Sequence, residues 1–140
     1  MATALDTNIL VSLWDKDESL NEEANYALAD AVSRGEIVIC GAVFAELLAL
    51  PGRTSGFIDR FVEESQIRVD WKIDEATWRS AGNGFANYAR KRRRNGSGLP
   101  GRILADFVVG AHALENRCSL LTLDKRTYKA AFPGLKVISI

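Results

Sequence analysis

Four carboxylates stand inside or directly beside apolar stretches of the sequence, where acidic side chains are uncommon. They are Asp6, Glu46, Asp106 and Asp124. An ionised carboxylate in an apolar setting costs several kcal/mol of free energy unless it is paired, hydrogen-bonded or bound to a cation. No Lys or Arg stands in these apolar runs at a position expected to face inward. Because ligand sets made only of oxygen favour hard divalent cations, the four acids predict a binding site for Mg²⁺ or Mn²⁺.

Three short polar side chains accompany two of these acids. Thr7 and Asn8 follow Asp6, and Thr122 stands two residues before Asp124. Metal sites need hydrogen-bonding groups that hold the carboxylates and bound water in position. These three side chains are suited to that task.

Each acid also has a purely structural interpretation. Asp6 and Asp124 could cap the helices expected after them. Glu46 and Asp106 could be satisfied by backbone amides or by an Arg from elsewhere in the fold. The occurrence of all four acids together, with polar side chains beside two of them, favours one shared site.

Short apolar segments alternate with segments of helical periodicity almost throughout the chain. We expect strands at residues 2–5, 37–40, 67–69, 119–123 and 136–140. We expect helices at residues 8–14, 19–34, 43–50, 57–62, 103–117 and 125–132, and a longer helix that is capped by Asp74 and ends at a cluster of Arg residues. This alternation predicts an α/β fold in which helices cover both faces of a central parallel sheet.

The predicted fold brings the acids together. Ligands of open parallel sheets bind beyond the carboxyl ends of the strands, and Asp6 and Asp124 directly follow two predicted strands. Asp106 is followed on its helix by Gly110 and Ala113, whose small size should let that helix face approach the sheet closely. We therefore expect the Asp106 carboxylate to reach inward.

The bulk composition is that of an ordinary globular chain. Its 140 residues, 47% hydrophobic and 26% charged, are enough for one core, so we expect a single domain over residues 1–140. Cys40 and Cys118 lie in apolar segments without a CxxC pairing, which favours buried thiols in the cytoplasm over a disulfide. The sequence contains neither a signal-peptide pattern nor an apolar run of roughly 18 residues, so no membrane association is expected.

Charge is unevenly distributed although the formal net charge is zero. Residues 1–51 contain nine acids and two bases, whereas six of the 18 bases lie between residues 90 and 102. We expect this basic segment to contact the phosphate backbone of a nucleic acid through Arg92, Arg93, Arg94 and Arg102. The alternative is a solvated helix end whose cations are stabilised by the helix dipole.

Four segments resemble, in order and spacing, the motifs of PIN-domain ribonucleases. They are Leu5-Asp6-Thr7-Asn8-Ile9-Leu10, Ala45-Glu46-Leu47, the segment from Ala105-Asp106 to Ala113, and Leu121-Thr122-Leu123-Asp124. The segment from Arg102 through Tyr128 to Pro133 is especially similar to VapC toxins of toxin–antitoxin pairs. The resemblance implies a PIN-like (Rossmann-like) three-layer α/β/α fold, Mg²⁺- or Mn²⁺-dependent cleavage of RNA, a homodimer, and neutralisation by a small cognate antitoxin.

The sequence departs from some PIN-like nucleases directly after the fourth motif. Lys125, Arg126 and Thr127 stand where those nucleases carry further acids, so we expect one bound ion. Asp6, Asp106 and Asp124 should hold it, with Glu46 acting directly or through water, and a water molecule should attack the phosphate. Such hydrolysis leaves a 5′-phosphate and a 3′-hydroxyl.

Other chemistries find little support in the sequence. The single histidine, His112, lies some 120° around its helix from Asp106, so we expect it to be structural. Neither a G-x-S-x-G motif nor a P-loop is present. The remaining alternatives are a non-catalytic RNA-binding domain and a housekeeping nuclease of the same fold.

Overall fold

A five-stranded parallel sheet forms the centre of the computed structural model, which describes residues 1–17, 19–96 and 104–140. The strand order is β3-β2-β1-β4-β5. The strands are β1 (Thr3–Leu5), β2 (Ile37–Cys40), β3 (Arg68–Asp70), β4 (Ser119–Thr122) and β5 (Val137–Ser139). The predicted parallel α/β fold is confirmed, and each strand begins or ends within a few residues of the predicted bounds.

The three central strands are buried along their whole length. Every residue of β1, β2 and β4 is buried, whereas the edge strands β3 and β5 are partly exposed. Strands that are covered on both faces read as continuous apolar runs, which is why the central strands were recognisable in the sequence. β1 pairs with β2 on one side, with Thr3 opposite Ile37, and with β4 on the other, with Leu5 opposite Leu121.

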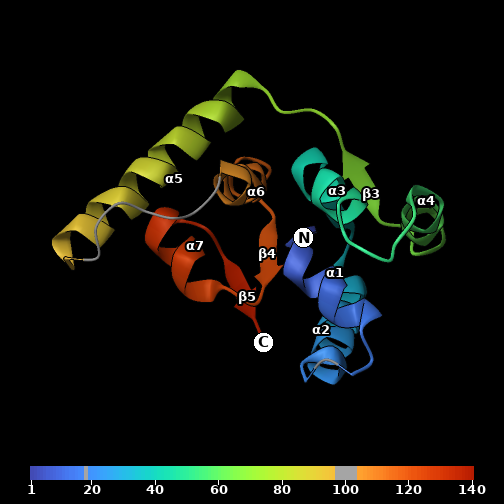
Figure 1. Cartoon of the computed structure of the whole chain (residues 1–140). Coiled ribbons are helices and arrows are strands. Elements are labelled where there is room, and N and C mark those ends of the chain that lie inside the picture. Colours follow the sequence, from blue (N-terminus) through green and yellow to red (C-terminus); the bar gives the residue numbers. More distant parts are fainter. Residues whose placement is uncertain (18, 97–103) are drawn as a thin grey trace.

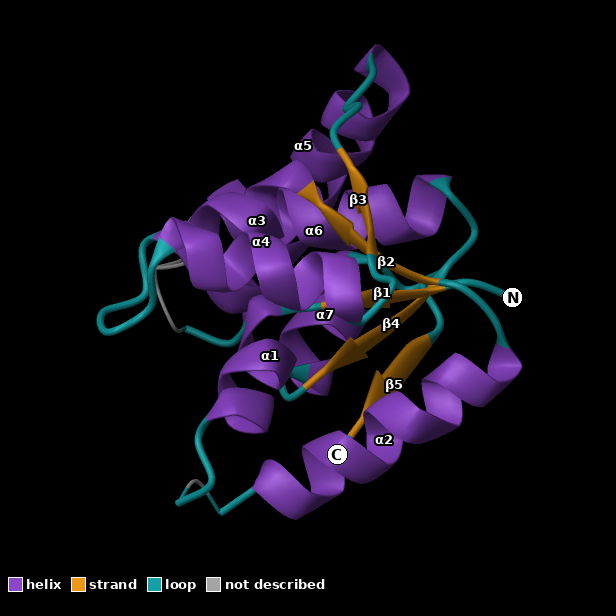
Figure 2. Ribbon diagram, turned by 90° about the vertical axis from the view of Figure 1, so that its right-hand side faces the viewer, coloured by secondary structure: helices purple, strands orange, loops and turns teal. Residues whose placement is uncertain are grey.

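Helices cover the sheet on both faces (Figures 1 and 2). In Figure 1, α5, α6 and α7 lie together on one side of the strands, and α1 and α2 lie on the other. The helices are α1 (Thr7–Trp14), α2 (Asn21–Arg34), α3 (Gly41–Leu48), α4 (Ser55–Glu64), α5 (Glu75–Arg94), α6 (Leu104–Glu115) and α7 (Lys125–Ala131). The expected cap of α5 is present, since the Asp74 side chain accepts a hydrogen bond from the backbone amide of Thr77.

The chain reverses its direction across the sheet at the central pair of strands. From β1 it proceeds to β2 and β3 on one side, and then crosses to β4 and β5 on the other. Neighbouring loops diverge at such a point and leave a crevice beyond the carboxyl ends of the strands. Asp6 follows β1 and Asp124 lies two residues after β4, so both acids stand at this reversal.

Helix α6 is the most deeply buried helix of the part of the chain that the structure describes. Its residues from Phe107 to Ala113 are all buried. A Cβ at Gly110 would overlap the ring of Phe132, at the end of α7, and a Cβ at Gly84 of α5 would overlap the same ring. The small residue therefore admits an aromatic side chain between α5, α6 and α7, and the closer approach of α6 to the sheet stays a prediction.

Two further expectations concern the thiols and the membrane. Cys40 and Cys118 are both free and buried, as predicted. Within the described ranges, no helix has the length and apolar character needed to cross a membrane.

Candidate metal-binding active site

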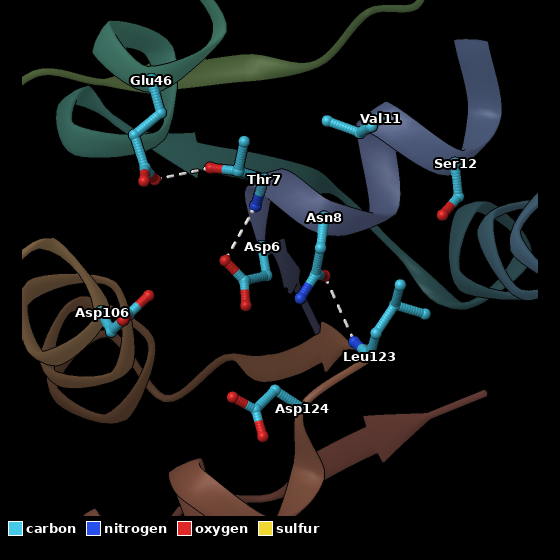
Figure 3. Close-up of a pocket in the computed structure, with 9 residues that line it drawn as sticks. All are labelled: Asp6, Thr7, Asn8, Val11, Ser12, Glu46, Asp106, Leu123 and Asp124. Atoms are coloured by element: carbon cyan, nitrogen blue, oxygen red, sulfur yellow. Dashed lines mark hydrogen bonds between the residues drawn. The ribbon is translucent and has the colours of Figure 1, made fainter. Parts of the chain in front are cut away.

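A pocket of about 470 Å³ opens at the carboxyl ends of β1 and β4 (Figure 3). It is lined by Asp6, Thr7, Asn8, Val11, Ser12, Glu46, Asp106, Leu123 and Asp124. The structure thus brings together all four acids that the sequence singled out. They come from the end of β1, from α3, from α6 and from the start of α7, and in Figure 3 they surround one common space.

Asp6 is the most buried of the four acids, with 5% of its surface exposed. Its Oδ1 accepts a hydrogen bond of 2.8 Å from the Thr7 amide, and its Oδ2 accepts one of 2.8 Å from the Thr122 hydroxyl. Burial raises the pKa of Asp6, and the nearby charge of Asp124 acts in the same direction. Hydrogen bonds from the side chains of Thr122 and Tyr128 and from the Thr7 amide lower the pKa and oppose part of this rise.

The Thr122 hydroxyl connects three parts of the site. Besides donating to Asp6, its Oγ1 accepts a hydrogen bond of 3.0 Å from the Asp124 amide and one of 3.5 Å from Nδ2 of Asn8. Asn8 in turn accepts from the amide of Leu123 through Oδ1. One fully buried hydroxyl therefore fixes the loop after β4 against the start of α1.

Glu46 is held from across the pocket. The Thr7 hydroxyl donates a hydrogen bond of 2.6 Å to Oε1 of Glu46, which links the first turn of α1 to α3. Thr7 therefore serves two acids, Asp6 through its amide and Glu46 through its hydroxyl. Of the three polar side chains expected to support the acids, Thr7 and Thr122 bond acid side chains directly, whereas the Asn8 side chain bonds Thr122 and the Leu123 amide.

Asp124 is both a helix cap and a residue of the shared acidic pocket, the two roles considered for it from the sequence. It is the N-cap of α7, where its Oδ1 accepts a hydrogen bond of 3.4 Å from the Thr127 amide, and it also lines the pocket. Asp6 likewise caps α1 while lining the pocket. Capping and participation in a shared site are therefore compatible at both positions.

The residues of this pocket fit a hard divalent cation in chemical type. The lining contains four carboxylates together with hydroxyl and amide oxygens, and none of its described residues is cationic. Among the described residues, however, no three acidic, histidine or cysteine side chains converge closely enough to ligate one ion as they stand. The fit therefore lies in the donor set and in the pocket that the four acids share.

His112 takes no part in this pocket. Its Nε2 lies 2.8 Å from Oδ2 of Asp70, at the end of the edge strand β3, and its side chain is 2% exposed. This contact lowers the pKa of Asp70, mainly through the hydrogen bond to the histidine. As expected, His112 lies away from the four acids of the pocket, and its structural role stays a prediction.

The basic segment divides into two parts. Arg92 is half-buried, with its guanidinium 5.9 Å from the centre of the Tyr88 ring, whereas Arg93 and Arg94 are exposed at the end of α5. None of these three lines the acidic pocket. Arg102, which was expected to join them, lies outside the described residues.

Four residues of the site were not found by sequence reasoning. Leu123, Val11 and Ser12 line the pocket, and the last two follow Asn8 at the i+3 and i+4 positions of α1, a spacing that could have revealed them. Tyr128, almost fully buried, lowers the pKa of Asp6 from α7. Its position four residues after Asp124 does not by itself predict a contact with Asp6, because that contact depends on how α7 packs.

Residues 3–133 match the PIN domain. With this fold and this pocket, the chain belongs to the PIN domain family. Comparison with curated proteins gave no significant match.

Solved structures of similar fold cover nearly the whole chain. VapBC-1 from nontypeable Haemophilus influenzae matches with a TM-score of 0.68 and 20% identity, covering 99% of this chain and 98% of that one. VapBC2 from Rickettsia felis, bound to a promoter DNA fragment, matches with a TM-score of 0.64 and 18% identity, covering 100% and 99%. FitAcB from Neisseria gonorrhoeae matches with a TM-score of 0.62 and 19% identity, covering 97% and 96%. At these identities the likeness concerns the fold.

Proposed function

We propose that this chain is a metal-dependent ribonuclease of the VapC type, acting as a toxin through a single PIN domain over residues 1–140. The observation that carries this proposal is the pocket at the reversal of the sheet, where carboxylates from four separate elements meet without a cation among the described lining residues. Four negative charges gathered there repel one another, and the raised pKa of Asp6 reflects burial together with part of this repulsion. A bound cation would offset the free-energy cost of this repulsion.

The residues of the pocket have two kinds of role in the reaction: the acids bind the metal, and the hydroxyl groups orient the acids. Asp6, Asp106 and Asp124 would hold one Mg²⁺ or Mn²⁺ ion, with Glu46 acting directly or through water. When bound, the ion would lower the pKa of water and neutralise charge on the attacked phosphate. The Thr122 hydroxyl keeps the Asp6 carboxylate oriented, and the Thr7 hydroxyl does the same for Glu46.

The absence of histidine from the pocket lining supports hydrolysis by water in preference to attack by the RNA 2′-hydroxyl. The His112 side chain instead forms a hydrogen bond with Asp70 at the end of β3. Hydrolysis of this kind leaves a 5′-phosphate and a 3′-hydroxyl. We assign Arg92, Arg93, Arg94 and Arg102 to phosphates of the substrate RNA other than the one that is cleaved.

We infer further that a small cognate antitoxin neutralises the chain in the cytoplasm and that the chain forms a homodimer. Support comes from the similar structures, which are VapBC and FitAcB proteins and, in Klebsiella pneumoniae, a toxin–antitoxin complex. The Rickettsia felis and Salmonella typhimurium structures are of VapBC bound to DNA.

The proposal is tested by Asp106→Asn with Asp59→Asn as its control. Asp106 lines the pocket on α6, whereas Asp59 is exposed on α4 and is not among the lining residues. Expression of the parent and of Asp59→Asn should arrest growth, and both proteins should cleave single-stranded RNA in a manner abolished by EDTA. Asp106→Asn should lose both properties while retaining the circular dichroism spectrum of the parent. Undiminished cleavage by folded Asp106→Asn contradicts the proposal.

A further inference from the structure

A second polar cavity lies between the end of α5 and the start of α7. Its volume is about 370 Å³, and it is lined by Tyr88, Lys91, Arg92, Asn95, Arg126, Thr127 and Ala130. We propose that this cavity, named here the α5–α7 pocket, binds a backbone phosphate of single-stranded RNA next to the phosphodiester that is cleaved. This assignment rests on the proposed ribonuclease function.

The acidic pocket and the α5–α7 pocket carry opposite charges, which suits one to phosphate cleavage through a metal and the other to direct phosphate binding. The described lining of the α5–α7 pocket includes three cations, Lys91, Arg92 and Arg126, and no acid. The acidic pocket has four carboxylates and no cation in its described lining. A phosphate undergoing hydrolysis requires a metal between it and the acids, whereas a neighbouring phosphate that is only held requires direct positive charge.

The two pockets share the first turn of α7. Asp124 lines the acidic pocket and caps this helix, and its Oδ1 accepts the hydrogen bond from the amide of Thr127, which lines the α5–α7 pocket. Arg126 stands two residues after Asp124. Because an α-helix rises about 1.5 Å per residue, these groups lie within a few Å of one another along the helix axis. One RNA strand can therefore reach both pockets.

The walls of the α5–α7 pocket are tied together. Nζ of Lys91 donates a hydrogen bond of 2.9 Å to the backbone oxygen of Ala130, and Nδ2 of Asn87 donates one of 3.1 Å to that of Ala131. These bonds join α5 to α7 beyond the acidic pocket, and Figure 1 shows the two helices side by side. A pocket with fixed walls loses little conformational entropy when it binds a ligand.

The side chains available suit a nucleotide better than a free anion. An arginine guanidinium binds phosphate through two parallel hydrogen bonds. Arg92 lies over the ring of Tyr88, and Tyr88 packs with its centroid 5.8 Å from that of the buried Phe107. Guanidinium planes and aromatic rings both stack on unpaired bases. The exposed Arg93 and Arg94 do not line this pocket, so the proposal gives Arg126, which the sequence did not single out, a larger role than theirs.

The experiment compares Arg126→Ala with Lys125→Ala. Both residues are exposed cations in the first turn of α7, but only Arg126 lines the pocket. Each change is made in full-length Asp106→Asn protein, so that a fluorescein-labelled single-stranded RNA of about 12 nucleotides stays intact, and affinity is measured by anisotropy over a salt series. Cleavage of unlabelled RNA is measured separately with Asp106 restored.

We expect Arg126→Ala to lose about tenfold in RNA affinity, as expected for one lost charged hydrogen bond. The slope of log affinity against log salt should fall by about 0.7, the value for one phosphate contact on a single strand. Lys125→Ala should stay within about twofold of the parent. Equal losses in the two variants overturn the proposal, as does a parent that binds no RNA or binds poly-L-glutamate as tightly as RNA.

The cleavage assay separates this inference from the proposed function. A parent protein that cleaves RNA while Arg126→Ala and Lys125→Ala behave alike overturns the α5–α7 pocket alone. Selective loss of RNA affinity in Arg126→Ala, with no metal-dependent cleavage by the parent, supports phosphate binding in the α5–α7 pocket but overturns the ribonuclease proposal and, with it, the place of this pocket beside a cleaved bond.

Discussion

The Thr122 hydroxyl, at the end of β4, donates a hydrogen bond of 2.8 Å to Oδ2 of Asp6, which directly follows β1. The bond crosses between the two central strands, at residues 116 positions apart in sequence. It is one of the interactions that keep the pKa of the buried Asp6 from rising further. The charged form of Asp6, which a cation requires, therefore depends on a neighbouring strand.

The first prediction follows from this bond. Thr122→Val removes the donor, so the pKa of Asp6 should rise, and the acidic limb of the pH profile of RNA cleavage should move to higher pH. The Asp124 amide also loses its acceptor, which should lower the free energy of unfolding by about 1–3 kcal/mol. Thr3→Val, at a buried Thr of β1 outside the pocket, is the control. An unchanged pH profile in folded Thr122→Val contradicts the role given to this hydroxyl.

The second prediction concerns Asp6 itself. Its pKa is raised in the folded state, so the folded protein binds more protons than the unfolded chain, and ionisation of Asp6 lowers stability as pH rises through the folded pKa. Asp6→Asn removes this effect and retains a good N-cap residue. In EDTA at neutral pH, urea unfolding should show equal or greater stability for the variant, with the gain disappearing below the pKa of a free Asp.

Asp6→Asn should weaken metal binding although it maintains or raises the stability of the metal-free protein. Asp6→Asn removes one negative charge from the donor set, and affinity for such cations depends on ligand charge. Calorimetric titration with Mn²⁺ should therefore show weaker binding than in the parent or in Asp59→Asn. Equal affinities would place the ion elsewhere.

The third prediction uses two glycines of α5. A Cβ at Gly84 would overlap the Phe132 ring, whereas nothing lies within 4 Å of a Cβ at Gly82. Gly84→Ala should lower the free energy of unfolding by about 1–3 kcal/mol because the buried ring must move. Gly82→Ala should raise it by about 0.5–1 kcal/mol through helix propensity. Thermal or urea unfolding measures both, and similar effects at the two sites would contradict the packing.

The fourth prediction separates His112 from catalysis. Its contact with Asp70 lowers the pKa of Asp70, so the stability that this carboxylate contributes is present above the pKa of a free Asp and is lost as pH falls through the folded pKa. Asp70→Asn should therefore be less stable than the parent at neutral pH, and the two should converge in acid. RNA cleavage by the folded variant should remain within about threefold of the parent. A much larger loss would connect His112 to the active site.

The sequence predicted those parts of the molecule that depend on local patterns. The apolar runs of β1, β2 and β4 were recognisable because both faces of these strands are covered. Asp6 and Asp124 could be brought to one crevice because they follow parallel strands. Glu46 and Asp106 were located by their unusual apolar surroundings, and the structure adds that all four line one pocket.

The remaining features depend on contacts between elements distant in sequence. Phe132 inserts beside Gly84 and Gly110, a contact that no periodicity in α5, α6 or α7 encodes. Arg92, Arg93 and Arg94 form one cluster in the sequence. In the structure, however, Arg92 lines the α5–α7 pocket together with Arg126, whereas the other two are exposed. Only the packing of α5 on α7 determines that division.

Asp6 and Asp124 each begin a helix and also line the pocket. Loss of an N-cap side chain typically costs about 0.5–2 kcal/mol, so replacement of either residue by Ala disturbs folding together with function. Under selection for relief from toxicity, Ala at these positions should yield degraded protein, whereas Asn should yield an intact, inactive chain. If the chain is the proposed toxin, the surviving inactive chain should still occupy its antitoxin, so the two kinds of mutant should differ in their effect on a cell that also carries the active toxin.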